Sequence, residues 1–533
     1  MDDLFEDSAE NGSFSRLHGG ANPCRHLLIA ALLLVLTTIM GGCSGPGQWW
    51  HNGFKVGPDY CPTKATVAET WIEANDPHLR VTETDNACWW TAFGDPTLNQ
   101  LVAEASQQNL TLKMAGCRIL EARAERGIAD GNLFPQQQQA TAQYSRNAMS
   151  ATSYPFNVIA LPEYYYNNWS AGFNAAWELD FWGRFRRAIE AADANLNAQV
   201  EGYDNVLVLL QAEAAANYIQ MRSYEERLEL AKKNLELQND TLRITTLRER
   251  QGLVTDLDVQ QATANLGATE ALIPILLTGH RKAQNRLCIL MGEPPHELTQ
   301  KVKSPGSIPL PPQEVIVGIP AELLRRRPDV RQAERDAAAQ SARIGIAEAE
   351  FYPHIAITGT IGLQAEHMNQ LFESNSLVGA IGPGISWNIL NYGRIKNNVR
   401  AEDARFQQAV LNYRDTVLRA NEEVENGIVG FLNEQDRVKS LDKSTRAGAR
   451  SVEIAMLQYQ KGLIAYQPLL DSERALVQQQ DALAESRGSV GMNLVAVYKA
   501  LGGGWQARLP STNQRQTELE PIAPGVPAPP PPP

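Results

Sequence analysis

Apolar residues recur at every seventh position along two long stretches of the chain, one in each half. In the first stretch they are Val200, Leu207, Ala214, Met221, Leu228, Leu235 and Leu242. In the second stretch they are Val410, Val417, Val424, Phe431, Val438 and Val452, with Thr445 in the same series. This heptad pattern is typical of helices that bury one seam in a coiled coil. Because residues 184–252 contain no proline, the first stretch is predicted to form one helix of about 100 Å at 1.5 Å per residue.

Each long helix is predicted to stop at a glycine, Gly252 or Gly462, and to be followed by a second helix. The helix after Gly252 runs to Met291 and contains Pro274, which is expected to kink it. The corresponding helix after Gly462 runs from Tyr466 to Leu501 and has its proline near the start, where proline is tolerated.

A second periodicity, of two residues, marks four shorter segments. Apolar residues alternate with small or polar ones over 169–181, 355–363 and 381–389, and more weakly in the ten residues after Pro135. This alternation over about ten residues, with aromatic residues near the ends, is what a transmembrane β-strand needs. A half-buried strand of a soluble sheet gives the same pattern.

The two halves of the chain are copies of one unit. Trp177, Gly183, Arg184, Gly252 and Leu253 recur as Trp387, Gly393, Arg394, Gly462 and Leu463, at a constant offset of 210 residues, as from 177 to 387. Upstream the offset is 218 residues, as from Pro135 to Pro353, so about eight additional residues lie between Pro135 and Trp177. A duplicated unit that changes length at one place is predicted to have a loop there.

Four strands cannot close a barrel, and an open sheet edge has unpaired backbone groups that lipid does not tolerate. Membrane-embedded strands would therefore require several chains to share one barrel. Since bacterial barrels begin at eight strands, two chains would supply 8 and three chains 12. The apolar helix seams also need partners, so the pattern predicts an oligomer with a membrane β-barrel and long projecting helices.

The N-terminal region carries one apolar run, Leu27–Met40, which follows Arg25 and His26 and precedes two glycines and Cys43. The run is too short to span a membrane as a helix, which takes about 20 residues. A basic flank, a short apolar run and small residues before a cleavage point are typical of a secretory signal. The segment resembles a bacterial lipoprotein signal, in which Cys43 becomes the acylated first residue.

Composition and charge narrow the function classes. The net charge of −12 argues against a nucleic-acid binder held by phosphate contacts. No HExxH, GxSxG or Walker-type motif is present, so no enzyme activity, cofactor or metal is predicted. Cys61 and Cys88 could pair in an oxidising compartment or stay free, and Cys117 and Cys288 are expected to be buried in helices.

Several longer motifs point to a family. They are VGPDY at 56–60, WWTAFGDPTLNQLVAEASQQNL at 89–110, LLRRRPDVRQAERDAAAQSARIGIAEAEFYP at 323–353, and the segments that begin GRFRR at Gly183 and GRIKN at Gly393. Through them the region from Val56 to Leu501 resembles TolC-like outer-membrane efflux proteins, in particular the NodT/OprM-like lipoprotein branch that works with resistance-nodulation-division pumps. The resemblance implies a homotrimer whose 12-stranded β-barrel in the outer membrane continues as a 12-helix α-barrel through the periplasm. It also implies a periplasmic adaptor protein and an inner-membrane pump as partners.

The resemblance further implies a periplasmic gate in the segment that begins at Tyr459. Tyr459, Asp471 and Arg474 match family residues that hold the tunnel tip closed by contacts between protomers. Asp471 and Arg474 could instead form an exposed i,i+3 helical pair of little energetic weight. Asp256 and Asp258 are further candidates for the mouth, but an acidic first helical turn explains them as well.

The resemblance also implies roles for the two helix-to-helix turns and for two tryptophans. Gly252 with Leu253 and Gly462 with Leu463 resemble tips that contact the adaptor hairpin, although a turn with positive φ takes glycine in any case. Trp177 and Trp387 are expected to be aromatic anchors at the membrane interface.

The resulting prediction is a mixed α-helical and membrane β-barrel protein that passively conducts exported small molecules. The expected segments are a lipoprotein signal (1–42), an irregular segment (43–90), two structural repeats (91–300 and 301–505) and a disordered proline-rich tail (506–533). A channel for type I protein secretion and a lipid-anchored coiled-coil scaffold without a pore are the alternatives.

Overall fold

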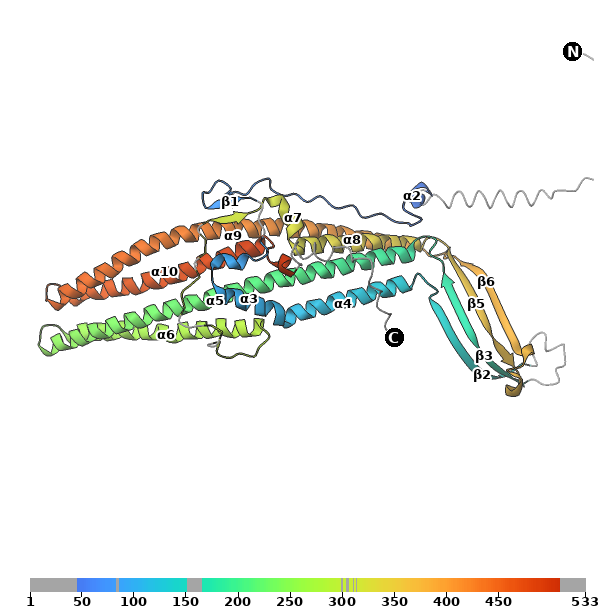
Figure 1. The fold of residues 1–533 in the computed structure, drawn as a ribbon, viewed down its shortest axis with the longest axis horizontal. Helices are drawn as coiled ribbons and strands as arrows, with labels where there is room; N and C mark the ends of the chain where they lie inside the picture. The colour runs from blue at the N-terminus through green and yellow to red at the C-terminus, as the bar shows by residue number, and fades with distance from the viewer. Residues whose placement is uncertain are drawn as a thin grey trace, which may run out of the picture.

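The computed structural model describes residues 46–82, 86–150, 165–298, 301–302, 306–309, 311–312 and 314–508. In this part of the chain the protein is a long rod of helices with a four-stranded sheet at one end (Figure 1). Cys43, the predicted signal segment and the residues from 509 onward lie outside the described residues. None of the described helices has the length and apolar character that a membrane crossing requires.

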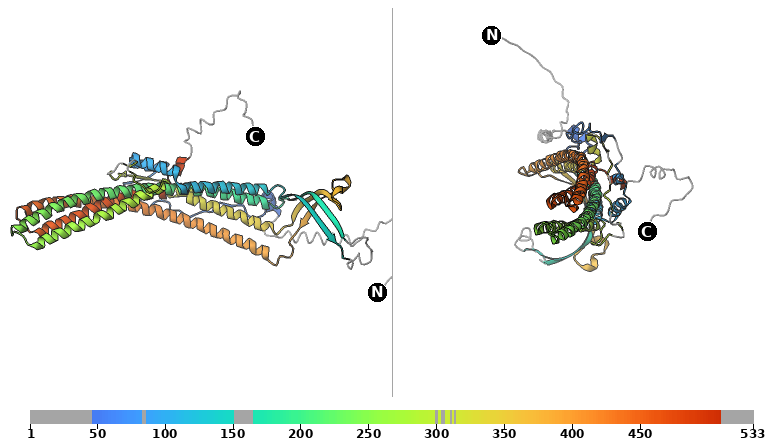
Figure 2. Two further views of the ribbon diagram at one scale, coloured as in Figure 1. Left: turned by 90° about the horizontal axis from the view of Figure 1, so that it is seen from below. Right: turned by 90° about the vertical axis from the view of Figure 1, so that its left-hand side faces the viewer.

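Two helical hairpins form the far half of the rod. The long helices α5 (Arg184–Arg250) and α9 (Arg394–Gln460) each have 67 residues. Their return helices α6 (Asp256–Leu290) and α10 (Tyr466–Ala500) each have 35 residues. The hairpins lie side by side (Figure 2). These equal helix lengths agree with the predicted duplication. Helix α6 continues through Pro274 as one helix.

Shorter helices pack on the half of α5 and α9 that is nearer the sheet. Helices α3 (Pro96–Gln108) and α4 (Leu110–Gly131) follow one another along α5, whereas α8 (Pro328–Ala349) packs between α5 and α9. Helices α4 and α8 have 22 residues each and occupy equivalent places in the two copies. Each copy thus contributes one long helix, one short helix on the sheet side and one return helix on the far side.

Most of the fully buried residues of the predicted heptad seams lie near the middle of the rod, and Val452 near the tip is also buried. Leu207, Met221, Val424 and Phe431 are at most 4% exposed, whereas Val200 and other seam residues toward the ends are only partly buried. The short 3-10 helix η1 (Trp89–Phe93) packs into the central core, where its three aromatic residues are buried. One chain therefore covers its seams in the centre and leaves several of the outer seam positions partly open.

The four predicted strands form one antiparallel sheet in the order β2-β3-β5-β6. Their bounds are Gln137–Ala148, Tyr165–Glu178, His354–Ala365 and Leu377–Ser386. The predictions that strands extend to Phe181 and to Ile389 are wrong at their ends. The chain leaves β3 at Glu178 and β6 at Ser386 because the following residues already turn toward α5 and α9.

A second, two-stranded sheet lies beside the middle of the rod. It pairs β1 (Leu79–Val81) with β4 (Val315–Val317) in parallel, and Trp71 nearby donates its indole N–H to the carbonyl of Gly318 at 2.6 Å. The remaining short elements are α2 (Pro46–His51), η2 (Pro320–Glu322), α7 (Leu323–Arg326), η3 (Met368–Gln370), η4 (Ser374–Ser376) and η5 (Trp505–Arg508). Folded structure thus continues three residues past 505.

The structure tests two predictions about the cysteines, one on pairing and one on burial. Cys61 is an exposed free thiol, so it forms no disulfide with Cys88. Cys288 is buried as predicted, but the prediction for Cys117 is wrong because this residue is exposed. Helix α4 buries only Leu112, Ala115 and Ala122, and Cys117 lies outside that narrow face.

Candidate functional site

Both long helices end at the tip of the rod in the same turn. Gly252 and Gly462 have φ of 70° and 75°, a left-handed conformation that favours glycine. The N–H of Leu253 donates to the carbonyl of Arg248 at 2.9 Å, and Leu463 donates to Gln458 at the same distance, which closes a Schellman motif in each copy. Leu253 is 62% exposed and Leu463 is 70% exposed. The turn geometry thus places an apolar side chain in solvent at the end of each hairpin.

Tyr459 lies just inside this tip and is fully buried within its own chain. Its hydroxyl donates to Thr245 Oγ1 of α5 at 3.2 Å. The guanidinium of Arg248 stacks 4.5 Å from the centre of its ring and donates to its carbonyl oxygen. Burial raises the pKa of the Tyr459 hydroxyl. The residue therefore joins α9 to α5 inside one protomer.

Asp471 and Arg474 lie on the exposed side of α10 near the same tip. Asp471 accepts a hydrogen bond from Gln467 at 2.9 Å, whereas Arg474 donates to Asn265 Oδ1 of α6 at 3.3 Å. Asp471 and Arg474 thus contact other groups and do not form the alternative i,i+3 pair. The two charged side chains keep exposed surface that a neighbouring protomer could contact.

Between them lies a residue that the sequence analysis missed. Glu473 is only 2% exposed, and its carboxylate accepts from Thr241 of α5 at 2.6 Å and from Asn265 of α6 at 3.3 Å. Burial raises its pKa to about 7, more than these two hydrogen bonds lower it. The position was detectable, since Glu473 falls in helical register with Leu469 and Leu476 on the buried face of α10.

Asp256 and Asp258 have local partners at the start of α6. Asp258 accepts from the backbone N–H of Thr255 at 3.3 Å in a capping box, and Asp256 accepts from Gln260 at 3.2 Å. These contacts give both carboxylates a structural explanation at the helix N-terminus.

The four-stranded sheet has one apolar and one polar face. Residues that face each other across antiparallel strands share a face, and the register therefore assigns every residue. The mainly apolar face carries Ala140, Ala142 and Tyr144; Trp169, Ala171, Phe173, Ala175 and Trp177; Ile355, Ile357, Gly359, Ile361 and Leu363; and Leu377, Gly379, Ile381, Pro383 and Ile385. The polar residues Gln138, Arg146 and Asn167 lie on the same face nearer its ends. The opposite face carries Gln139, Thr141, Gln143 and Ser145; Asn168, Ser170 and Asn174; and Thr358, Thr360 and Gln364. On β6 this face has Val378, Ala380, Gly382 and Gly384, so its polar residues lie on the other three strands. Phe173, Ile361 and Ile381 on the apolar face are 67%, 58% and 84% exposed.

Trp177 and Trp387 occupy matching places where the sheet meets the helices. The indole N–H of Trp177 donates to the carbonyl of Leu133 at 3.1 Å, and that of Trp387 donates to the carbonyl of Phe351 at 2.9 Å. Both side chains keep more than a third of their surface exposed. An indole with its polar atom satisfied and its ring partly exposed suits an interfacial position.

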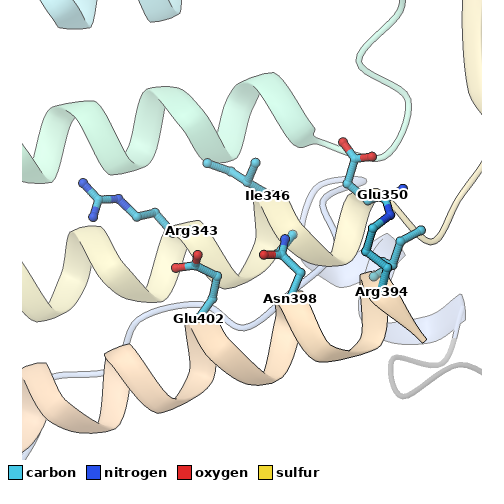
Figure 3. A pocket seen from close by; sticks show the side chains of 8 residues that line it. Arg343, Ile346, Glu350, Arg394, Asn398 and Glu402 are labelled. Atoms are coloured by element: carbon cyan, nitrogen blue, oxygen red, sulfur yellow. The ribbon is translucent and has the colours of Figure 1, made fainter. Parts of the chain in front are cut away.

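A charged groove of about 450 Å³ lies between α8 and α9 near the sheet (Figure 3). Gln340 donates to Glu402 at 2.6 Å, and Arg184 donates to Glu350 at 3.2 Å. Its lining carries charged groups of both signs, from Arg343, Arg394, Glu350 and Glu402. In the described ranges no cluster of three or more His, Cys, Asp or Glu residues could hold a metal ion.

Comparison with known proteins agrees with this geometry. A family model described as "Outer membrane efflux protein" matches residues 101–293 and 319–503. Nodulation protein T of Rhizobium leguminosarum bv. trifolii is 28% identical over 457 residues, which cover 85% of this chain and 95% of that protein. Cation efflux system protein CusC of Escherichia coli is 28% identical over 492 residues, which cover 91% and 100%. The solved outer-membrane channel OprN is 32% identical, with a TM-score of 0.79 over 85% of this chain and 99% of that one. Given a family match over more than half of its length, the chain belongs to the outer membrane efflux protein family and is an outer-membrane channel of an efflux system.

Proposed function

We propose that three copies of this chain form one continuous channel through the outer membrane and the periplasm. The observation that carries the proposal is the sheet, in which four strands share one apolar face and leave β2 and β6 as edges. Joining β6 of one protomer to β2 of the next would satisfy both edges and place the apolar face toward lipid. Three copies would give the 12-stranded barrel that the family resemblance implies.

The helices support the same assembly. Apolar residues on α4 and α6 remain exposed in one chain, among them Leu120 at 61% and Ile275 at 66%. Exposed apolar positions on long helices favour contact with neighbouring protomers. In the trimer the helices would continue the barrel as a 12-helix tunnel.

Native mass spectrometry of the detergent-solubilised full chain tests the architecture. The expected result is a threefold species that cross-linking also traps. A monodisperse monomer that retains its β-structure would contradict the proposal, and a stable dimer would favour the eight-stranded alternative.

The tip is proposed to be both gate and docking site. Asp471 and Arg474 would bind neighbouring protomers around the threefold axis, while Tyr459 holds α9 against α5 behind them. Exposed ion pairs contribute roughly 0–1 kcal/mol each, so three copies of a few bonds would keep the open state rare but accessible to partner binding. Leu253 and Leu463 would contact a periplasmic adaptor protein, which links the channel to an inner-membrane pump.

Transport through this tunnel is proposed to be passive, with energy supplied by the pump and exported small molecules as cargo. Acylation of Cys43 would add a lipid anchor to the membrane-inserted barrel. The amphipathic four-stranded sheet disfavours the alternative of a scaffold without a pore, because such a scaffold has no need of an exposed apolar sheet face.

A further inference from the structure

Six aromatic rings meet where the helices pass into the sheet. Trp49, Trp50 and Phe54 come from the N-terminal segment, Phe181 and Trp182 follow β3, and Tyr352 precedes β5. We call these six residues the aromatic platform. Trp49 lies 5.4 Å from Phe181 and 5.6 Å from Trp182 between ring centroids, and Trp182 stacks on Tyr352 at 4.4 Å.

The N-terminal part of the platform has a defined conformation. Helix α2 ends in a Schellman turn in which Phe54 N–H donates to the carbonyl of Trp49 at 2.8 Å and Gly53 N–H donates to Trp50 at 3.3 Å. This turn gives Phe54 a φ of 63° and brings its ring 4.7 Å from Trp49 and 5.0 Å from Trp50. Its two rim residues, Trp50 and Phe54, remain 66% and 40% exposed.

Two arginines of α5 fasten this segment to the body of the protein. Arg186 donates to the carbonyls of Gly53 at 2.6 Å and Phe54 at 2.9 Å. Arg187, which is 2% exposed, donates to the carbonyls of Val56 at 3.0 Å and Gly57 at 2.9 Å. Because these two arginines bind four backbone carbonyls of the N-terminal segment, the exposed rings are fixed in place and form a preorganised surface.

The distribution of exposed aromatic residues shows which end of the molecule this surface belongs to. Every exposed tryptophan, phenylalanine and tyrosine in the described part of the chain lies in the strands, in the connections next to them or in this N-terminal segment. The four long helices α5, α6, α9 and α10 expose none. Aromatic rings collect where one end of the side chain meets lipid and the other meets water.

Charge argues against an ionic partner. The nearby cations Lys55, Arg186 and Arg187 are each paired with a carboxylate, on Glu190, Asp180 and both Asp59 and Glu190 respectively. The platform therefore presents aromatic rings, and the positive charges near it are neutralised by carboxylates. Such a surface suits a zwitterionic headgroup layer, which carries no net charge. Helix α2, which carries Trp49 and Trp50, lies near the end of the rod where the strands begin (Figure 1).

We propose that the aromatic platform binds the headgroup region of the phospholipid leaflet around the barrel, with Trp50 and Phe54 inserted beside the strands. The inference rests on the proposed membrane barrel and adds a second lipid contact. The platform would seat the base of the helical rod at the membrane surface independently of acylation at Cys43.

Photo-cross-linking in native outer membranes of cells fed radiolabelled phospholipid precursors identifies the occupant directly. The probe p-benzoylphenylalanine replaces Trp50 in the full chain, with a second variant at Phe54. Ile381 on the apolar sheet face serves as the lipid-facing control, and Leu463 at the distal tip is the control remote from lipid. We expect phospholipid adducts at positions 50, 54 and 381, at several-fold the yield of position 463.

The controls separate this inference from the proposed barrel. Lipid adducts at 381 but not at 50 or 54 would overturn the platform and leave the barrel intact. Adducts at 50 to a second copy of the chain or to another protein would also overturn it and would identify the true occupant. Failure at 381 would contradict the membrane barrel itself.

Discussion

Glu473 provides a direct test of how the helical tip is held together. Its carboxyl group joins α10 to Thr241 of α5 and Asn265 of α6, and burial raises its pKa from 4.5 to about 7. One pKa unit corresponds to about 1.4 kcal/mol, so the shift represents roughly 3 kcal/mol between the packed and the solvated carboxyl group. Because the pKa is raised in the packed state, this contribution is fully present below pH 4.5 and is lost as the pH rises through about 7. Acidic conditions should therefore tighten the tip, and mildly alkaline conditions should loosen it.

Hydrogen exchange followed by mass spectrometry measures this loosening locally. Peptides that span residues 459–476 in the reconstituted protein should exchange up to roughly a hundredfold faster above the pKa than well below it, after correction for intrinsic rates. Glu473→Gln keeps the shape of the side chain but does not titrate, so the pH dependence should disappear. Glu485→Gln changes an exposed carboxylate on the same helix and should behave like the wild type. An unchanged pH dependence in Glu473→Gln would refute the assignment.

Three further predictions concern the gate, the anchor and the turns. The double variant Asp471→Ala with Arg474→Ala should raise conductance several-fold in planar bilayers, and Asp471→Ala alone should reduce cation preference; unchanged conductance and selectivity would mean that both residues only decorate a solvated helix face. Cys43→Ala, supplied with a cleavable signal, should lose labelling by a palmitate analogue yet still fractionate with the outer membrane, whereas unchanged labelling would contradict the lipidation site. Gly252→Ala and Gly462→Ala should each destabilise the tip by about 1 kcal/mol, seen as faster local hydrogen exchange, because alanine disfavours positive φ; unchanged exchange would show that the turns relax.

Local patterns were sufficient to predict the helices and strands. A proline-free heptad stretch predicts α5 because one helix must keep a single seam buried, and two-residue alternation predicts β5 because one sheet face is apolar. The turns at Gly252 and Gly462 were also predictable, since a left-handed residue after a long helix is usually glycine. Strand ends were less predictable. Trp387 continues the alternation of β6, but its indole bonds to Phe351 outside the strand.

Features made by distant segments were beyond these patterns. Helical register places Glu473 on the buried face of α10, but its hydrogen-bond partners Thr241 and Asn265 come from α5 and α6. Nothing in the sequence near Glu473 predicts those partners. The aromatic platform unites residues near 50, 181 and 352, which no local periodicity connects. Cys117 was predicted to be buried but is exposed. Helical periodicity alone does not reveal that α4 has a neighbour on only one narrow face.

The duplication offers a structural reason for the proposed assembly of one chain with its own copies. Strands β2 and β5 are equivalent in the two copies, as are β3 and β6. The intramolecular junction of β3 with β5 therefore pairs the same two kinds of strand as the proposed junction of β6 with β2 of the next protomer. The helices follow the same rule. In the proposed trimer, the contacts of α5 with α8 and α10 inside the chain would correspond to contacts of α9 with the next protomer's α4 and α6. These are the helices that leave Leu120 and Ile275 exposed. Each chain therefore contains a complete example of the interface that the trimer needs, and repetition of that interface around a closed ring removes every sheet edge.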